Sequence, residues 1–321
     1  MAEQAGLAVI ERLVGTGALC STPADEIVRS PNMTLEQARY CPASVGRARI
    51  RGKIATVVDQ EVPPMPWVAA DDGCDIYYET HGSGPAVVFA SGFMGITDIW
   101  RAQIEALSDS YQCIAFDNRG NGRSEKPLPK IAYGVERHAR DLEAVLDATG
   151  VSRAVLVGHS MGGNTASTYY FAHPDRVAGI VYVGSYVSGS QIRDVGNTLE
   201  AIKTAVATPS GRVGFYRAVG LPEEIAMESA KWPLYSVLGN AESFIVFDMT
   251  DKISQITVPC LILHGEKDIV SPLDPCGYGL RDGLPDATLE IFEGVNHCPA
   301  VEAPDKANRL IADFLKKVHA S

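Results

Sequence analysis

The sequence lacks a long apolar run, an excess of basic residues and any pair of closely spaced cysteines. A helix that spans a bilayer needs about 20 consecutive apolar residues, and no segment of the 321-residue chain approaches that length. No basic region precedes the short apolar stretch at 6–10, so we expect no secretory signal. These absences predict a cytoplasmic protein that does not enter a membrane.

The charge balance is acidic and argues against several partners. Asp and Glu number 39 against 28 Lys and Arg, which gives a formal net charge of −11 at pH 7. An acidic surface repels nucleic-acid phosphates and anionic lipid, so we expect neither as a partner. The seven cysteines are odd in number and form no C-x-x-C pair, which predicts reduced thiols rather than a disulfide framework or a zinc site.

What is present is the composition of a globular protein, with 46% apolar and 21% charged residues. From Trp67 onward, strand-like and helix-like segments alternate, which is typical of a mostly parallel sheet with helices on both faces. Strands are expected at 75–80, 86–90, 112–116, 154–157, 178–183, 260–263 and 288–292. Helices are expected at 99–107, 135–149, 161–172, 273–280 and 303–318.

Two regions depart from this alternation. Residues 1–66 contain signals for two short helices, a strand at 50–58 and a proline-rich linker, and we interpret them as an N-terminal extension. Residues 186–256 contain helical fragments broken by prolines and are interpreted as an insertion. The core is therefore predicted at 67–185 and 257–321, and the extension is a candidate contact of a homodimer.

The strongest chemical motif is the G-x-S-x-G pattern around Ser160. It follows the apolar strand 154–157 and opens the helix 161–172, the strand–turn–helix setting of a nucleophile elbow. Gly158 and Gly162 leave the room that so tight a turn requires. The motif predicts that Ser160 is an exposed nucleophilic serine.

A serine hydroxyl needs a base, and the base needs an acid that fixes its tautomer. His297 is the candidate base because it follows the strand 288–292 and precedes the last helix; His264, at the end of a strand, is its main competitor. Asp268, on the loop after the strand 260–263, is the candidate acid, and Glu266 and Asp274 are the alternatives. The resulting order of serine, acid and histidine is the order of a nucleophile-elbow hydrolase.

Several motifs in sequence order resemble the α/β-hydrolase superfamily, and the resemblance runs over about residues 67–321. Besides the elbow, 117–124 match the family's D-x-R-G-x-G-x-S loop, and 173–177 resemble its usual join between helix and strand. The resemblance implies an eight-stranded type of sheet, a helical cap in the insertion and no metal or organic cofactor. It also implies an oxyanion hole formed by the backbone N–H groups of Phe93 and Met161. Ser91 stands where the family usually has histidine, which leaves the support of this loop open.

The insertion is rich in aromatic residues that suit the wall of an apolar pocket. The candidate wall residues are Met94, Tyr186, Phe215, Trp232, Tyr235 and Phe244. We expect a small hydrophobic acyl substrate, cleaved as an ester or lactone through an acyl-enzyme. The alternatives are diketone C–C bond hydrolysis or perhydrolysis with the same residues, and ligand binding without catalysis.

Overall fold

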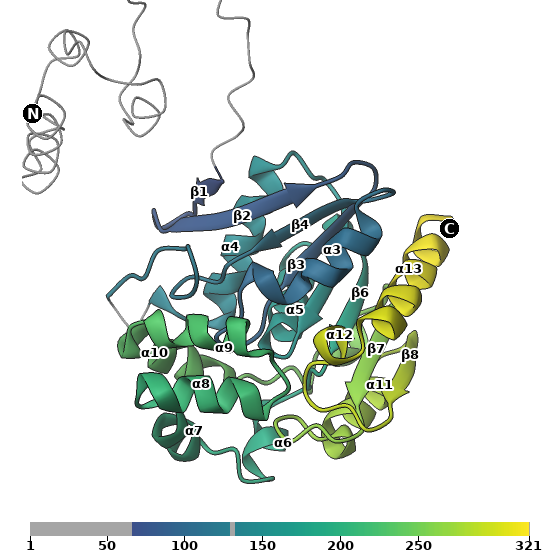
Figure 1. Ribbon diagram of the computed structural model, residues 1–321. Coiled ribbons are helices and arrows are strands. Elements are labelled where there is room, and N and C mark those ends of the chain that lie inside the picture. The colour runs from purple at the N-terminus through teal and green to yellow at the C-terminus, as the bar shows by residue number, and fades with distance from the viewer. Residues whose placement is uncertain (1–65, 129–131, 321) are drawn as a thin grey trace, which may run out of the picture. The chain divides into compact units, whose positions relative to one another are not determined.

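The computed structural model describes residues 66–128 and 132–320 (Figure 1). Apart from Pro66, the extension expected at 1–66 lies outside the described residues, so its helices, its strand and its contact in a homodimer stay predictions.

The described chain is built around one eight-stranded sheet with the order β1-β2-β4-β3-β5-β6-β7-β8. The strands are β1 (Trp67–Ala69), β2 (Asp75–His81), β3 (Ala86–Ala90), β4 (Gln112–Phe116), β5 (Ala154–His159), β6 (Val177–Val183), β7 (Cys260–Gly265) and β8 (Ala287–Phe292). β2 pairs antiparallel with both β1 and β4, and all other pairs are parallel. The predicted α/β architecture with a mostly parallel sheet is confirmed.

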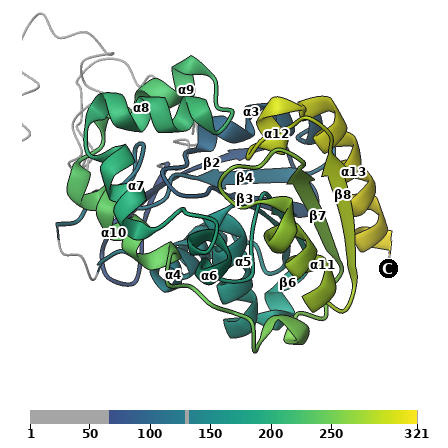
Figure 2. The ribbon, with the colours of Figure 1, turned by 90° about the horizontal axis from the view of Figure 1, so that it is seen from below.

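Helices cover both faces of this sheet (Figures 1 and 2). One face packs on α3 (Arg101–Leu107), α12 (Pro299–Glu302) and α13 (Pro304–Ala320), and the other on α4 (Val135–Ala148), α5 (Met161–Ala172) and α11 (Tyr278–Gly283). Successive residues of β3 alternate between the two layers: Val87 and Phe89 belong to the first core and Val88 to the second. Burial on both faces explains why the central strands read as continuous apolar runs.

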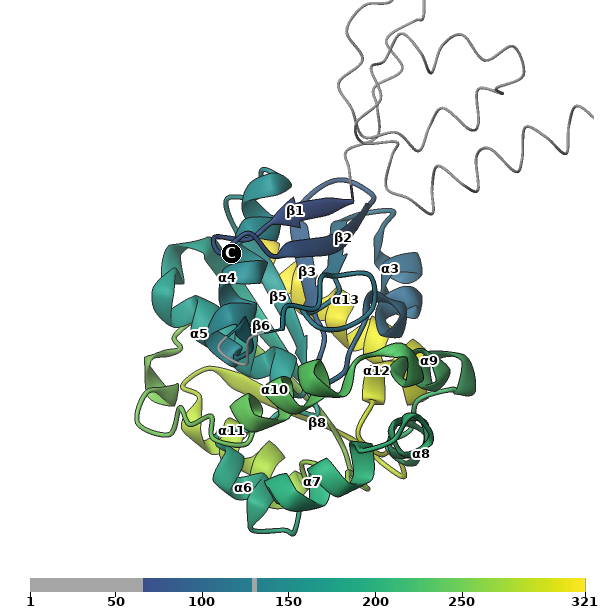
Figure 3. The ribbon, with the colours of Figure 1, turned by 90° about the vertical axis from the view of Figure 1, so that its left-hand side faces the viewer.

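Between β6 and β7 the chain forms a set of helices that we call the inserted helices. They are α6 (Gly189–Arg193), α7 (Leu199–Val206), α8 (Pro209–Ala218), α9 (Glu223–Glu228) and α10 (Leu234–Phe244). Local signals begin two of them: the Thr198 hydroxyl accepts Ala201 N–H, and the Thr208 hydroxyl accepts Gly211 N–H with a proline in the first turn. Figure 3 shows these helices grouped at one end of the sheet.

Candidate active site

The turn between β5 and α5 holds Ser160 in a strained conformation. Its φ of 52° and ψ of −121° lie where non-glycine residues are rarely found. The Ser160 N–H donates to Val183 O at the end of β6 (2.8 Å), which ties the turn to the next strand. A Cβ at Gly158 would lie 2.5 Å from the Gly162 backbone, and one at Gly162 would lie 2.1 Å from Ala90 O. The glycines are therefore required by close backbone approach on both sides of the serine.

The loops after β7 and β8 bring Asp268 and His297 together. His297 Nδ1 lies 2.8 Å from Asp268 Oδ2, and a carboxylate only accepts, so Nδ1 carries the proton and Nε2 is left as the acceptor. Asp268 Oδ1 accepts the backbone N–H groups of Val270 (2.8 Å) and Ser271 (2.9 Å). The Ser271 hydroxyl lies 3.1 Å from Asp268 Oδ2. These contacts fix the carboxylate in one orientation beside the imidazole.

The environment of Asp268 keeps it ionised. Burial by itself would raise the pKa of this carboxyl group, because the charge loses its hydration. Electrostatic attraction to the imidazoles of His297 and His264, with the hydrogen bonds from His297 and from the backbone N–H of Ser271, outweighs burial and holds the pKa of Asp268 below its ordinary value. A carboxylate that is ionised near neutral pH can stabilise an imidazolium.

The competing residues are not bonded to His297 in this way. His264 lies next to the acid, with its Nε2 3.6 Å from Asp268 Oδ2. His264 is fully buried, its Nε2 donates to Ser271 O (2.7 Å), and it is not among the residues that line the cavity around the serine. Glu266 and Asp274 are exposed, and the described contacts of His297 include neither. Of the candidate bases and acids, the structure therefore pairs His297 with Asp268.

Ser160 and His297 line the same cavity, at the carboxyl ends of the parallel strands. Open α/β sheets bind their ligands at this edge. Both residues are almost covered, with 6% and 4% of their surface exposed. No hydrogen bond joins the two side chains in the described part of the chain. Catalytic hydrogen bonds are often long without substrate and shorten when it binds.

The walls of the cavity are apolar and come largely from the inserted helices. They are Phe93, Tyr186, Ile192, Ile202, Phe215, Tyr216, Val219, Leu221, Phe244 and Val270. The predicted wall residues Tyr186, Phe215 and Phe244 are among them. The isoleucines, valines and Leu221 were not predicted, because apolar residues on short helices and loops give no sequence signal that separates a cavity wall from a core.

Three predicted wall residues do not line this cavity. Met94 is 1% exposed and belongs to the core on the α3 face. Trp232 is buried, and its ring packs edge-on against Tyr216, with the ring centroids 6.2 Å apart. Tyr235 is 37% exposed, and its hydroxyl donates to Lys126 O (2.8 Å). The packing of loops and helices, which composition does not reveal, turns these side chains elsewhere.

Most polar groups of the wall already have partners. The hydroxyls of Tyr186 and Tyr216 donate to Phe244 O (3.4 Å) and Phe93 O (3.1 Å). The amide of Asn197 donates to two carbonyls of the loop after β7, both at 3.0 Å. The cavity therefore suits an apolar ligand whose reactive polar group faces the serine and the histidine.

His159 also lines the cavity, although the sequence did not assign it a role. Its Nε2 lies 3.1 Å from His297 O, and the two rings are 4.8 Å apart between centroids. Burial, with the nearby His297, lowers the pKa of His159 to about 3, so the ring is neutral and donates to the carbonyl. Cys298 Sγ lies 3.6 Å from the same nitrogen, and burial raises the pKa of this thiol well above its ordinary value.

The loop after β3 passes next to the serine. A Cβ at Gly92 would lie 2.9 Å from Ser160 Cβ, which leaves the backbone of this loop beside Ser160. Phe93 lines the cavity, and its ring packs on Phe244 with a centroid distance of 5.0 Å. Met161 is the first residue of α5, where backbone N–H groups have no partner inside the helix. Both backbone positions expected to bind an oxyanion thus lie next to Ser160.

Ser91, at the position where the family resemblance predicts histidine, supports this loop from within. Its hydroxyl donates to Ile96 O (3.1 Å) and accepts the indole N–H of Trp100 (3.0 Å). The side chain is 1% exposed. The loop is therefore closed on itself by a serine and a tryptophan in place of the usual histidine.

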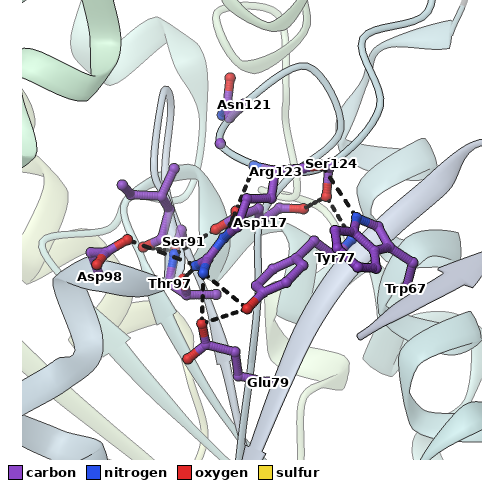
Figure 4. Close-up of polar contacts among 12 residues, drawn as sticks. Trp67, Tyr77, Glu79, Ser91, Thr97, Asp98, Asp117, Asn121, Arg123 and Ser124 are labelled. Carbon is purple, nitrogen blue, oxygen red and sulfur yellow. Dashed lines mark hydrogen bonds and ion pairs between the residues drawn. The ribbon is translucent and has the colours of Figure 1, made fainter. Parts of the chain in front are cut away.

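The segment 117–124 braces the same loop from outside (Figure 4). Asp117 Oδ1 accepts Thr97 N–H (2.8 Å), and its Oδ2 accepts Arg123 N–H (2.8 Å). The Arg123 guanidinium donates to the Tyr77 hydroxyl (2.9 Å) and lies 3.0 Å from the Glu79 carboxylate. The D-x-R-G-x-G-x-S motif thus connects the loop to β2.

The sheet order and a strained serine turn after β5 define an α/β-hydrolase architecture. A family model for the alpha/beta hydrolase fold matches residues 85–232. The chain is 31% identical over 277 residues to a non-heme chloroperoxidase of Streptomyces lividans, covering 78% of this chain and 100% of the relative. It is 29% identical over 270 residues to a putative carbamate hydrolase, RutD, of Azorhizobium caulinodans, covering 79% and 99%.

A solved protein, Est816, described as an N-acyl homoserine lactone degrading enzyme, superposes with a TM-score of 0.69 at 29% identity. The match covers 78% of this chain and 100% of that chain. This chain belongs to the α/β-hydrolase superfamily. Among the described residues, no helix has the length and apolarity to cross a bilayer, and no group of three or more His, Cys, Asp or Glu side chains could hold a metal ion.

Proposed function

We propose that this protein is a serine hydrolase that cleaves a mid-sized hydrophobic carboxylic ester or lactone through an acyl-enzyme. The observation that carries the proposal is the cavity shared by Ser160 and His297, with Asp268 bonded to the far nitrogen of the imidazole. Membership of the α/β-hydrolase superfamily supports hydrolase activity. The substrate and the covalent intermediate are our inference.

In the proposed mechanism, Ser160 Oγ attacks the acyl carbonyl while His297 Nε2 takes its proton. Asp268 holds the imidazole and stabilises its charge. The N–H groups of Phe93 and Met161 bind the oxyanion, and each such donor contributes about 3–4 kcal/mol to barrier reduction in comparable hydrolases. The alcohol leaves with the proton from His297. Water then attacks the acyl-enzyme with the same base, which frees Ser160 and the acid.

The apolar wall supports a hydrophobic acyl group as the part of the substrate that is recognised. We propose that the inserted helices act as a cap, because Ile202, Phe215 and Phe244 reach the cavity from α7, α8 and α10. The similarity to Est816, described as an N-acyl homoserine lactone degrading enzyme, favours lactones among the esters to be tested. A net charge of −11 argues mildly against a strongly anionic substrate.

Perhydrolysis is the second candidate, and the chloroperoxidase relatives favour it. In this reaction hydrogen peroxide takes the place of water: it attacks the acyl-enzyme, its proton goes to His297, and a peracid leaves in place of the acid. The same residues would serve both reactions, because only the second nucleophile differs.

The test begins with a fluorophosphonate probe on the purified full-length chain. Labelling of the wild type and loss of labelling in Ser160→Ala are expected, and labelling that persists in the variant rules out Ser160 as nucleophile. A panel of aryl esters, lactones, a carbamate and a β-diketone then identifies the bond that is cleaved. Peroxide-dependent bromination in acetate buffer identifies perhydrolysis. Tight ligand binding without turnover of any substrate would favour a non-catalytic protein.

A further inference from the structure

The backbone around Phe93 has a geometry that constrains the donor expected to bind the oxyanion. Gly92 C=O and Phe93 N–H belong to one peptide unit, which is trans and therefore points these two groups in opposite directions. Whatever fixes the carbonyl oxygen of Gly92 therefore also fixes the direction of the Phe93 N–H. The Cβ position of Gly92 lies against Ser160, so a rotation of this peptide would be felt at the nucleophile.

Asn118 binds this carbonyl from the core. Its Nδ2 donates to Gly92 O (3.1 Å) and to Ser91 O (2.9 Å). Carbonyl oxygens only accept, so the amide nitrogen must be the atom that faces them. Gly92 O also accepts Gly95 N–H (2.9 Å). Asn118 is 1% exposed, so water does not compete easily for these bonds.

We infer that Asn118 is the positioning residue of the oxyanion donor at Phe93, an inference that rests on the proposed function. Two hydrogen bonds from one amide hold two successive carbonyls and so prevent the Gly92–Phe93 peptide from rotating. Hydrogen bonds to a peptide carbonyl also polarise its N–H, which strengthens the donor. Asn118 touches neither substrate nor nucleophile in this role; it sets the direction in which Phe93 N–H points.

The chain provides a matched control in Asn121. It belongs to the same 117–124 motif, is fully buried, and donates through Nδ2 to a carbonyl of the same loop, Gly95 O (3.4 Å). That carbonyl lies beyond the Phe93 peptide. Asn118→Ala and Asn121→Ala therefore each remove a side-chain amide of the 117–124 segment that binds the loop after β3. Only Asn118→Ala removes a hydrogen bond to the peptide that carries the Phe93 N–H.

The experiment measures kcat and KM on an activated aryl ester. The concentration of active protein used to calculate kcat is taken from the fraction of molecules that the fluorophosphonate probe labels when labelling is complete. A loss of about 10- to 100-fold in kcat with little change in KM is expected for Asn118→Ala, because misplacement at the reacting centre reaches this size. Asn121→Ala is expected to remain close to the wild type in kcat. Asn118→Leu keeps the shape of the side chain without a donor and should fall as far as Asn118→Ala.

A second readout separates positioning from loosened structure. The affinity for phenylboronic acid, whose tetrahedral adduct with serine places an oxygen in the oxyanion hole, should fall in proportion to kcat/KM. Equal kcat values for Asn118→Ala and Asn121→Ala, or a loss confined to KM or to the labelled fraction, overturn the inference. Should Asn118→Ala not fold, Asn118→Leu decides, and wild-type kcat in that variant overturns the inference. If esterase activity instead persists in the Ser160→Ala variant, the proposed function itself is refuted.

Discussion

Replacing Asp268 by Asn tests the proposed acid by changing one atom. The Asn carbonyl oxygen can still accept the two backbone N–H groups now bound by Oδ1, from Val270 and Ser271. The amide nitrogen then takes the place of Oδ2 and faces His297 Nδ1 as a donor. The imidazole must respond by carrying its proton on Nε2. In that tautomer it cannot accept a proton from Ser160.

The expected loss is large because the base is removed without disturbing its surroundings. The same substitution in a Ser-His-Asp enzyme lowers kcat by about 10⁴, which corresponds to about 5 kcal/mol of activation free energy. We expect a loss of this order in Asp268→Asn. The thermal unfolding temperature should change little, since the Asn oxygen retains both backbone hydrogen bonds.

The assay compares initial rates of aryl-ester hydrolysis with those of Glu266→Gln, which changes an exposed acid that sequence alone leaves as an alternative. Glu266→Gln should retain the wild-type rate. Activity in Asp268→Asn above about a tenth of the wild type would refute the tautomer argument, because a wrong tautomer leaves no base. A loss in Glu266→Gln as large as that in Asp268→Asn would contradict the assignment of the acid.

Three further outcomes are expected. Burial lowers the pKa of His138 from 6.5 to about 4, so between these pH values the unfolded chain binds a proton that the native chain does not, and the free energy of unfolding falls by up to about 1.4 kcal/mol per pH unit on acidification. In urea unfolding, His138→Gln should therefore lose less stability than the wild type between about pH 7 and about pH 5. An equal loss in the two proteins contradicts this. Gly162→Ala should abolish ester hydrolysis, because its Cβ would lie 2.1 Å from the carbonyl oxygen of Ala90 in β3. Gly214→Ala in α8, where an added Cβ has no neighbour within 4 Å, should instead raise the free energy of unfolding by about 0.5–1 kcal/mol. An active Gly162→Ala variant would show that the serine turn can relax. Tyr216→Phe removes only the hydrogen bond to Phe93 O and should lower kcat several-fold with an unchanged unfolding temperature; an unchanged kcat would show that this bond does not position the loop.

The elements whose signals are local were predicted closely. Strands 86–90 and 112–116 and the helix 161–172 have the same bounds in the structure. The two strands are short, largely apolar runs next to turn residues, and the helix follows the glycine-bounded serine turn and ends before Pro174. β1 was missed, since three residues at a sheet edge carry too little pattern. The expected helix at 99–107 begins with a 3₁₀ turn, Thr97–Trp100, before α3.

The relation of Asp268 to His297 was predicted from their places after β7 and β8, since the carboxyl ends of neighbouring parallel strands meet at one edge. The sequence favoured Asp268 by its place on the loop but left Glu266 and Asp274 open as alternatives; the contacts that set Asp268 apart are seen only in the structure. Three carboxylates so close together in the chain differ little in sequence. They differ in space because only one is buried with backbone donors around it.

By itself the sequence determined the alternation of strands and helices, the tight serine turn and the order of the reactive residues, because these depend on neighbours along the chain. Only the tertiary structure decided which side chains form the cavity wall, that His159 contacts His297, and that Asn118 holds the peptide of Phe93. These contacts join residues that lie far apart in the chain. Which atoms meet over such separations depends on how helices rotate and how loops pack against the sheet.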